Sequence, residues 1–91
     1  MSITRSVQIT NKRGLHARAS AKFVGAVAKL PPSVEVKVAK DGNDAAGGSI
    51  LGLMMLGAAK GDSITISAEG DGAEGAVGAL CELVEAKFGE D

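Results

Sequence analysis

The residues of this chain that could do chemistry gather around His16, which is its one histidine. Arg18 follows shortly after it, and Lys12, Arg13 and Lys22 are also close in sequence. A neutral imidazole is a nucleophile that titrates near neutrality, and a guanidinium offers fixed donors to an anion. This combination indicates phosphoryl transfer through histidine. The plainer alternative is that His16 ends a turn among solvated charges, because a local His-x-Arg pattern is a weak signal.

His16 is expected where a strand leads into a helix. Apolar and polar residues alternate over residues 3–9, which is typical of a half-buried strand, and after His16 the apolar residues recur at helical spacing as far as Leu30. The first backbone N–H groups of a helix have no partner inside it, and the helix dipole adds about half a positive charge at that end. Such an end binds anions well. The predicted position of His16 therefore suits an incoming phosphate.

Three further strands are predicted. Alternating patterns favour strands at 34–39 and 63–68, and the hairpin signal Asp41-Gly42 returns the chain into a short polar strand near 43–45. Because this last strand is brief and polar, we expect it at an edge of the sheet.

Helices are predicted before and after the last of these strands. Ser49 is placed to cap a helix over 50–56, and Gly57 to end it. Asp71, with Glu74 three residues later, is interpreted as the cap of a final helix whose apolar stripe runs to Phe88.

The predicted elements follow the order β-α-β-β-α-β-α in one domain over residues 1–91. Strands with one polar face imply a four-stranded antiparallel sheet that is covered by three helices on only one side. The sequence therefore predicts an α+β fold of the open-faced β-sandwich type.

Composition limits what such a domain can do. The chain has 91 residues, a formal net charge of -1 and 2% aromatic residues, so it lacks both the basic charge and the stacking platforms of a nucleic-acid binder. Its one cysteine, Cys81, cannot form an internal disulfide and is expected to be buried, and no spacing supports a metal site. We find no signal peptide and no membrane-spanning stretch, and we expect a cytoplasmic monomer without membrane insertion.

The predicted helix at 50–56 is too apolar all round to be wholly solvated. A domain this small cannot easily bury all of its large apolar residues, so we expect part of them to form an exposed, adaptable docking surface. The residues assigned to that surface are Ile50, Leu51, Leu53, Met54 and Met55. A purely internal role for the same residues is the alternative.

Two stretches resemble the HPr family, the histidine-containing phosphocarriers of the bacterial phosphoenolpyruvate:sugar phosphotransferase system (PTS). The segment Gly14-Leu15-His16-Ala17-Arg18, with Asn11 before it and Phe23-Val24 after it, is similar to that family's active-site segment. Residues 49–61, which begin Ser49-Ile50-Leu51-Gly52, are similar to its regulatory serine helix and the turn that follows. The two motifs stand in the family's order, and the resemblance spans essentially the whole chain.

This resemblance implies a stoichiometric phosphocarrier that is not an enzyme and needs no cofactor. His16 would accept a phosphoryl group at Nδ1 from the phosphohistidine of Enzyme I and pass it to IIA proteins. Arg18 would stabilise the transferred group, with support from Asn11 and Ala17. Phosphorylation of Ser49 by an HPr serine kinase/phosphorylase would add roughly two negative charges to the docking surface and weaken partner binding. The alternative is that Ser49 serves only as the cap of its helix.

One position departs from the family pattern. Ala19 stands where the family usually has proline directly after the arginine. Proline would preset the first helical turn, whereas alanine keeps its N–H, so the anion site remains but is expected to be less rigid.

Two other functions are weighed against the carrier. A regulatory module of the nitrogen-type phosphotransferase system would keep the same fold and the Ser49 surface while acting on partner proteins rather than on sugar uptake. A small acylphosphatase-like hydrolase would need an Asn and Arg arrangement that positions a water, and the sequence offers no clear one.

Overall fold

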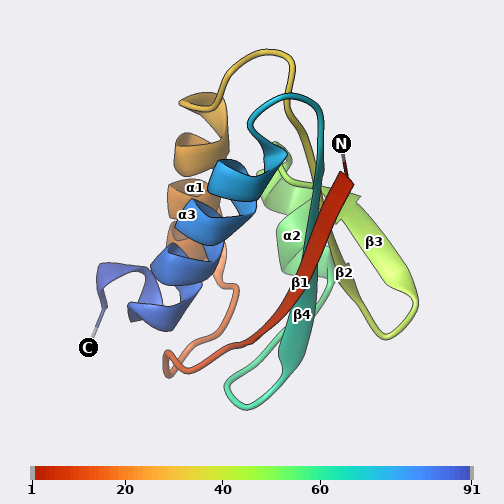
Figure 1. Ribbon diagram of the computed structural model, residues 1–91. Coiled ribbons are helices and arrows are strands. Elements are labelled where there is room, and N and C mark those ends of the chain that lie inside the picture. The colour runs from red at the N-terminus through yellow and green to blue at the C-terminus, as the bar shows by residue number, and fades with distance from the viewer. Residues whose placement is uncertain (1, 91) are drawn as a thin grey trace.

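Four strands and three α-helices make up the fold of residues 2–90, the part of the chain that the computed structural model describes (Figure 1). In chain order they are β1 (Ser2–Gln8), α1 (Ala17–Ala28), β2 (Glu35–Lys40), β3 (Asn43–Ala46), α2 (Ile50–Met55), β4 (Ser63–Glu69) and α3 (Ala73–Glu85), followed by a 3-10 turn at Lys87–Gly89. The predicted order β-α-β-β-α-β-α is confirmed, and each observed element overlaps its predicted range. None of the helices within residues 2–90 is both long and apolar enough to cross a membrane.

The strands form one antiparallel sheet in the order β1-β4-β2-β3. β4 lies in the middle and pairs with β1 along its whole length, from Ser2 opposite Glu69 to Gln8 opposite Ser63. β3 pairs only with β2, so the predicted edge strand is at an edge. The first and last strands of the chain are therefore neighbours in the sheet.

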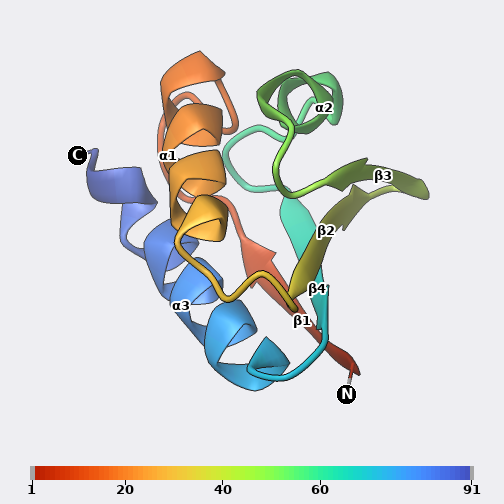
Figure 2. The same cartoon turned by 90° about the horizontal axis from the view of Figure 1, so that it is seen from above.

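All three helices lie on one side of the sheet, and the other side is uncovered (Figures 1 and 2). The predicted α+β open-faced sandwich is confirmed. One apolar core fills the space between the sheet and the helices, and the largest of its fully buried side chains are Ile9, Phe23, Val38, Leu53, Ile64, Ile66, Val77, Leu80, Val84 and Phe88. Cys81 is buried in this core with a free thiol, as its helical pattern predicts.

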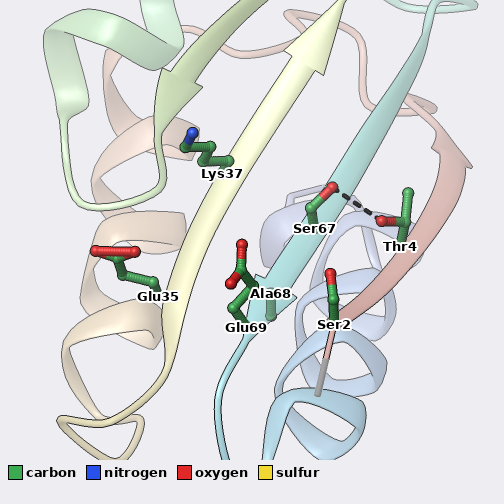
Figure 3. A pocket seen from close by; sticks show the side chains of 7 residues that line it. All are labelled: Ser2, Thr4, Glu35, Lys37, Ser67, Ala68 and Glu69. Carbon is green, nitrogen blue, oxygen red and sulfur yellow. Dashed lines mark hydrogen bonds between the residues drawn. The ribbon is translucent and has the colours of Figure 1, made fainter.

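The uncovered face of the sheet is polar and holds a shallow hollow of about 250 Å³ (Figure 3). Glu35 and Lys37 of β2 line one part of it. Across the other strands, the hydroxyl oxygens of Thr4 and Ser67 lie 3.2 Å apart. Such paired hydroxyls and charges are stable in water, which is why the strands alternate between apolar and polar residues.

The predicted cap of α3 is wrong. Gly72 takes the cap position with a φ of 94° and makes no side-chain cap bond, which leaves Asp71 outside the helix. The helix also ends earlier than its apolar stripe, at Glu85. Phe88 follows in a turn with a φ of 54° and is still 1% exposed, because the change of chain direction returns its ring to the core.

Candidate functional site

The turn before α1 is fixed by close backbone contacts. Gly14 has a φ of 62°, and a Cβ at this position would lie 2.3 Å from the carbonyl oxygen of Ala58. The N–H of Leu15 donates to that same oxygen at 3.0 Å. Asn11 Nδ2 donates to the carbonyl oxygen of Gly14 at 2.9 Å. These contacts hold the start of α1 against the segment that follows α2.

His16 is the N-cap of α1, and both of its ring nitrogens are engaged. Nδ1 accepts a hydrogen bond from the backbone N–H of Arg18 at 3.3 Å. Nε2 lies 2.6 Å from Oε2 of Glu90. Because an N–H donates to Nδ1, that nitrogen carries no hydrogen, and the ring proton is assigned to Nε2, where it donates to the carboxylate. The lone pair of Nδ1 is therefore the nucleophilic position and faces the helix N-terminus.

Glu90 is itself held from two directions. Asn11 Nδ2 donates to its Oε1 at 3.1 Å. Lys22 Nζ donates to the carbonyl oxygen of Phe88 at 2.7 Å and so ties the segment that carries Glu90 to α1. Burial would raise the pKa of the Glu90 carboxyl, but hydrogen bonds from Asn11 and His16, together with electrostatic attraction to His16 and Lys22, outweigh it and lower that pKa.

Cationic side chains surround this pair. Lys12, Arg13 and Arg18 line a hollow of about 260 Å³ together with His16 and Glu90. The side chain of His16 is 21% exposed, so the imidazole is reachable from the hollow while its two hydrogen bonds fix its orientation. A site of this kind attracts an anion, presents it with backbone N–H groups and a guanidinium, and offers one nucleophilic nitrogen.

Most of the residues predicted to act at this site are brought together. Ala17 is the first residue of α1, and Arg18 follows it on the exposed side. Asn11 is fully buried, and its Nδ2 donates to Gly14 and Glu90 rather than facing the hollow. Its Oδ1 has no hydrogen-bond partner among the described residues. Asn11 therefore fixes the turn and the Glu90 carboxylate through its side-chain amide.

Glu90 was not among the predicted site residues. It lies 74 positions after His16, and no periodicity or local motif links the two. Only the fold brings them together. The only sequence signal that could have suggested it is an acidic residue just after the buried Phe88.

A second feature is an exposed apolar surface on α2. Ile50, Leu51, Met54 and Met55 are 41%, 68%, 40% and 78% exposed, and we refer to them as the α2 patch. Ser49 caps this helix: its Oγ accepts a hydrogen bond from the N–H of Gly52 at 2.9 Å. α1 packs against α2, so the patch and the hollow around His16 belong to neighbouring helices.

Leu53 does not belong to the α2 patch, contrary to the sequence-based prediction. Its side chain is 0% exposed and forms part of the core. The reason is geometric, since a helix against a sheet must turn one side inward, and in α2 Leu53 is on that side. The apolar residues of this helix thus divide between a core role and an exposed role.

Comparison with known proteins identifies the family. Residues 3–86 match the family model described as the PTS HPr component phosphorylation site. The chain is 43% identical over 88 residues to the phosphocarrier protein HPr of Neisseria meningitidis, with 97% of each chain covered. It is 40% identical over 88 residues to the phosphocarrier protein NPr of Shewanella violacea, covering 97% of this chain and 94% of that one.

Solved structures agree with these relatives. The crystal structure of HPr from Thermoanaerobacter tengcongensis superimposes with a TM-score of 0.90 at 43% identity, covering 98% of both chains. The phosphocarrier HPr from Bacillus anthracis gives a TM-score of 0.85 at 36% identity, covering 91% of this chain and 96% of that one. The chain therefore belongs to the HPr family of PTS phosphocarriers, whose members carry a phosphoryl group and are not catalysts themselves.

Proposed function

We propose that His16 accepts a phosphoryl group at Nδ1 from the phosphohistidine of Enzyme I and passes it to a IIA protein. The observation that carries this proposal is the orientation of the ring. Its Nδ1 lone pair faces the N-terminus of α1, and its Nε2 is occupied by Glu90. A phosphoryl group on Nδ1 would lie where backbone N–H groups and the guanidinium of Arg18 can meet its oxygens.

Phosphoryl transfer requires the protein mainly to position the reacting groups and to stabilise their charge. Nδ1 attacks phosphorus in line, and the electron pair of the breaking P–N bond returns to the donor imidazole. The N–H of Arg18, which had donated to Nδ1, is then free to donate to a phosphoryl oxygen. Transfer between two imidazoles is close to balanced in energy, so the same contacts serve acceptance and donation.

Intact mass spectrometry tests this proposal. The protein is incubated with phosphoenolpyruvate and an Enzyme I from the same organism, with His16→Ala in parallel. We expect the mass of one phosphoryl group to be added to the wild type only, and to be lost in acid. Phosphorylation of His16→Ala, or none of the wild type, would show that His16 is not the acceptor. Arg18→Ala should still be phosphorylated, about 10- to 100-fold more slowly, because it loses a charged donor to the transferred group.

We propose that the α2 patch is the docking surface for these partners and that phosphorylation of Ser49 by a dedicated serine kinase weakens the docking. Ser49 lies directly before Ile50 and Leu51, so a phosphate there brings charge and bound water to an apolar surface. Replacement by Asp and by Asn separates charge from capping, because the two residues are about equally good N-caps. Ser49→Asp should bind Enzyme I several-fold more weakly than Ser49→Asn does, and equal affinities would contradict the proposal.

A second candidate is a regulatory role in the nitrogen-type system, and the 40% identity to NPr of Shewanella violacea favours it specifically. The two roles differ in their partners. Phosphoryl transfer to a sugar-specific IIA protein would support sugar uptake. Transfer only to a nitrogen-type IIA protein, or from only a nitrogen-type Enzyme I, would support regulation.

A further inference from the structure

We propose that Glu90 is a positioning residue for the reaction at His16: its carboxylate holds the proton on Nε2 and stabilises the ring once Nδ1 carries the phosphoryl group. This inference rests on the proposed role of His16. It assigns a function to a residue that no sequence pattern singles out.

The contact between the Glu90 carboxylate and His16 is held in place by neighbouring residues and is not a chance meeting of exposed side chains. The carboxylate is 2.6 Å from Nε2, and the side chain of Glu90 is 18% exposed. Its other oxygen is bound by the fully buried Asn11, and Lys22 anchors the preceding backbone. The carboxylate is therefore fixed before any partner binds, and the imidazole cannot turn its other nitrogen toward the helix without breaking the contact.

The charges around the ring explain why a carboxylate is needed. The other charged side chains that line the hollow are Lys12 and Arg13 from the turn and Arg18 from α1, and Lys22 lies near Glu90. All of these are cationic, which suits a phosphoryl group but disfavours a positive imidazole. Among the described residues that line the hollow, Glu90 is the sole carboxylate and the only group that offsets this repulsion.

The transfer step makes the ring positive without moving a proton. Before transfer the ring is neutral, with its hydrogen on Nε2. The N–P bond to the donor breaks, a new one forms at Nδ1, and the Nε2 hydrogen stays where it is, so the product ring is an imidazolium. Pairing with Glu90 favours this state. An imidazolium leaves phosphorus as neutral imidazole, a far better leaving group than imidazolate, so Glu90 also keeps the phosphoryl group transferable.

Hydrolysis of the phosphorylated protein in the absence of an acceptor tests this role. Wild type and Glu90→Gln are first phosphorylated with Enzyme I and phosphoenolpyruvate and then separated from both. The loss of the phosphoryl group is followed by intact mass spectrometry between about pH 6 and pH 9. The rate should fall at high pH as the Nε2 proton is lost. In Glu90→Gln this fall should come about half a pH unit lower, which makes hydrolysis about 3-fold slower at mildly alkaline pH.

Two controls separate this role from others. Glu85→Gln removes the same charge from an exposed site on α3 and should keep the wild-type profile, whereas Glu90→Asp, which retains the carboxylate, should lie closer to the wild type than Glu90→Gln does. A purely structural role would lower the stability to urea without moving the pH profile. Identical profiles for Glu90→Gln and wild type would overturn the inference, while failure of the wild type to be phosphorylated would instead overturn the assignment of His16.

Discussion

At residue scale, two glycines show how differently one residue type can matter. Gly14 combines a positive φ with a Cβ position that is 2.3 Å from a backbone oxygen, so it is required both by its own conformation and by its neighbour. Gly25 lies within α1, and a Cβ there would meet nothing within 4 Å. The first glycine shapes the turn before His16, and the second merely weakens a helix.

Alanine at each glycine should therefore act in opposite directions. Gly14→Ala should lower the free energy of unfolding by about 2–4 kcal/mol, because strain and a clash with rigid backbone add together. Gly25→Ala should raise it by about 0.5–1 kcal/mol through helix propensity. Urea denaturation measures both, and a Gly14→Ala variant as stable as the wild type would show that the turn can relax.

The carboxyl of Glu90 should make stability depend on pH. Its pKa is lower in the folded protein than its ordinary value of 4.5. In acid the unfolded chain therefore binds a proton at this carboxyl more readily than the folded protein does, which favours unfolding. The stabilisation is thus fully present above about pH 5 and is lost as pH falls through the folded pKa. Urea midpoints of wild type and Glu90→Gln should differ near neutrality and converge at about pH 3. A difference that stays constant over that range would contradict this expectation.

At the scale of elements, the six residues of α2 serve both the core and the exposed α2 patch. Leu53 faces the core and is 0% exposed, while Met55 is 78% exposed in the α2 patch. Leu53→Ala should cost about 2–5 kcal/mol of stability, as large-to-small changes in a core do. Met55→Ala should change stability by less than about 0.5 kcal/mol.

The functional effects of the same two variants should be reversed. Met55→Ala should raise the KM of Enzyme I for this protein roughly fivefold, because it removes an apolar contact from the proposed docking surface. Leu53→Ala, assayed at a temperature where it is folded, should stay closer to the wild type. An unchanged KM for Met55→Ala would place the docking surface elsewhere.

At the scale of the whole molecule, one core joins every element. Ile66 in the central strand β4 is fully buried, and its strand contacts both β1 and β2. Ile66→Ala should lower the free energy of unfolding by about 2–5 kcal/mol. Helices and strands should still unfold together, because a domain this small has no second core to hold either layer. Coincident transitions by circular dichroism and by NMR of strand amides would check this, and a helical signal that outlasts the strands would refute it.

The sequence carried enough information for the fold because its elements are locally encoded. Alternation over β1 and β4 and the spacing after His16 each report a local preference, and the hairpin glycine reports a turn. The errors came where direction in space decides. The run of α2 is apolar all round, so no period could show that Leu53 turns inward while Met55 turns out. Gly72 displaced Asp71 from the cap position by adopting a left-handed conformation, which composition does not reveal.

The residues of the candidate site also differ in how far the sequence could predict them. His16 and Arg18 lie two residues apart on the chain, so a local motif could identify them. Glu90 contributes only through a contact across 74 positions, which depends on how α3 and the following turn pack against α1. A single sequence holds no pattern for such a contact, and the physical arrangement had to be seen.

The strand order also predicts the order in which the backbone amide hydrogens of the sheet exchange with solvent. Both flanks of β4 are bonded to neighbours, so its amide hydrogens are released to solvent only when the whole sheet opens. β3 is four residues long and has one neighbour, so its hydrogens should exchange with deuterium in brief local openings. The sheet should thus begin to open at β3, next to α2, while the amide hydrogens of β4 are the last to exchange with deuterium.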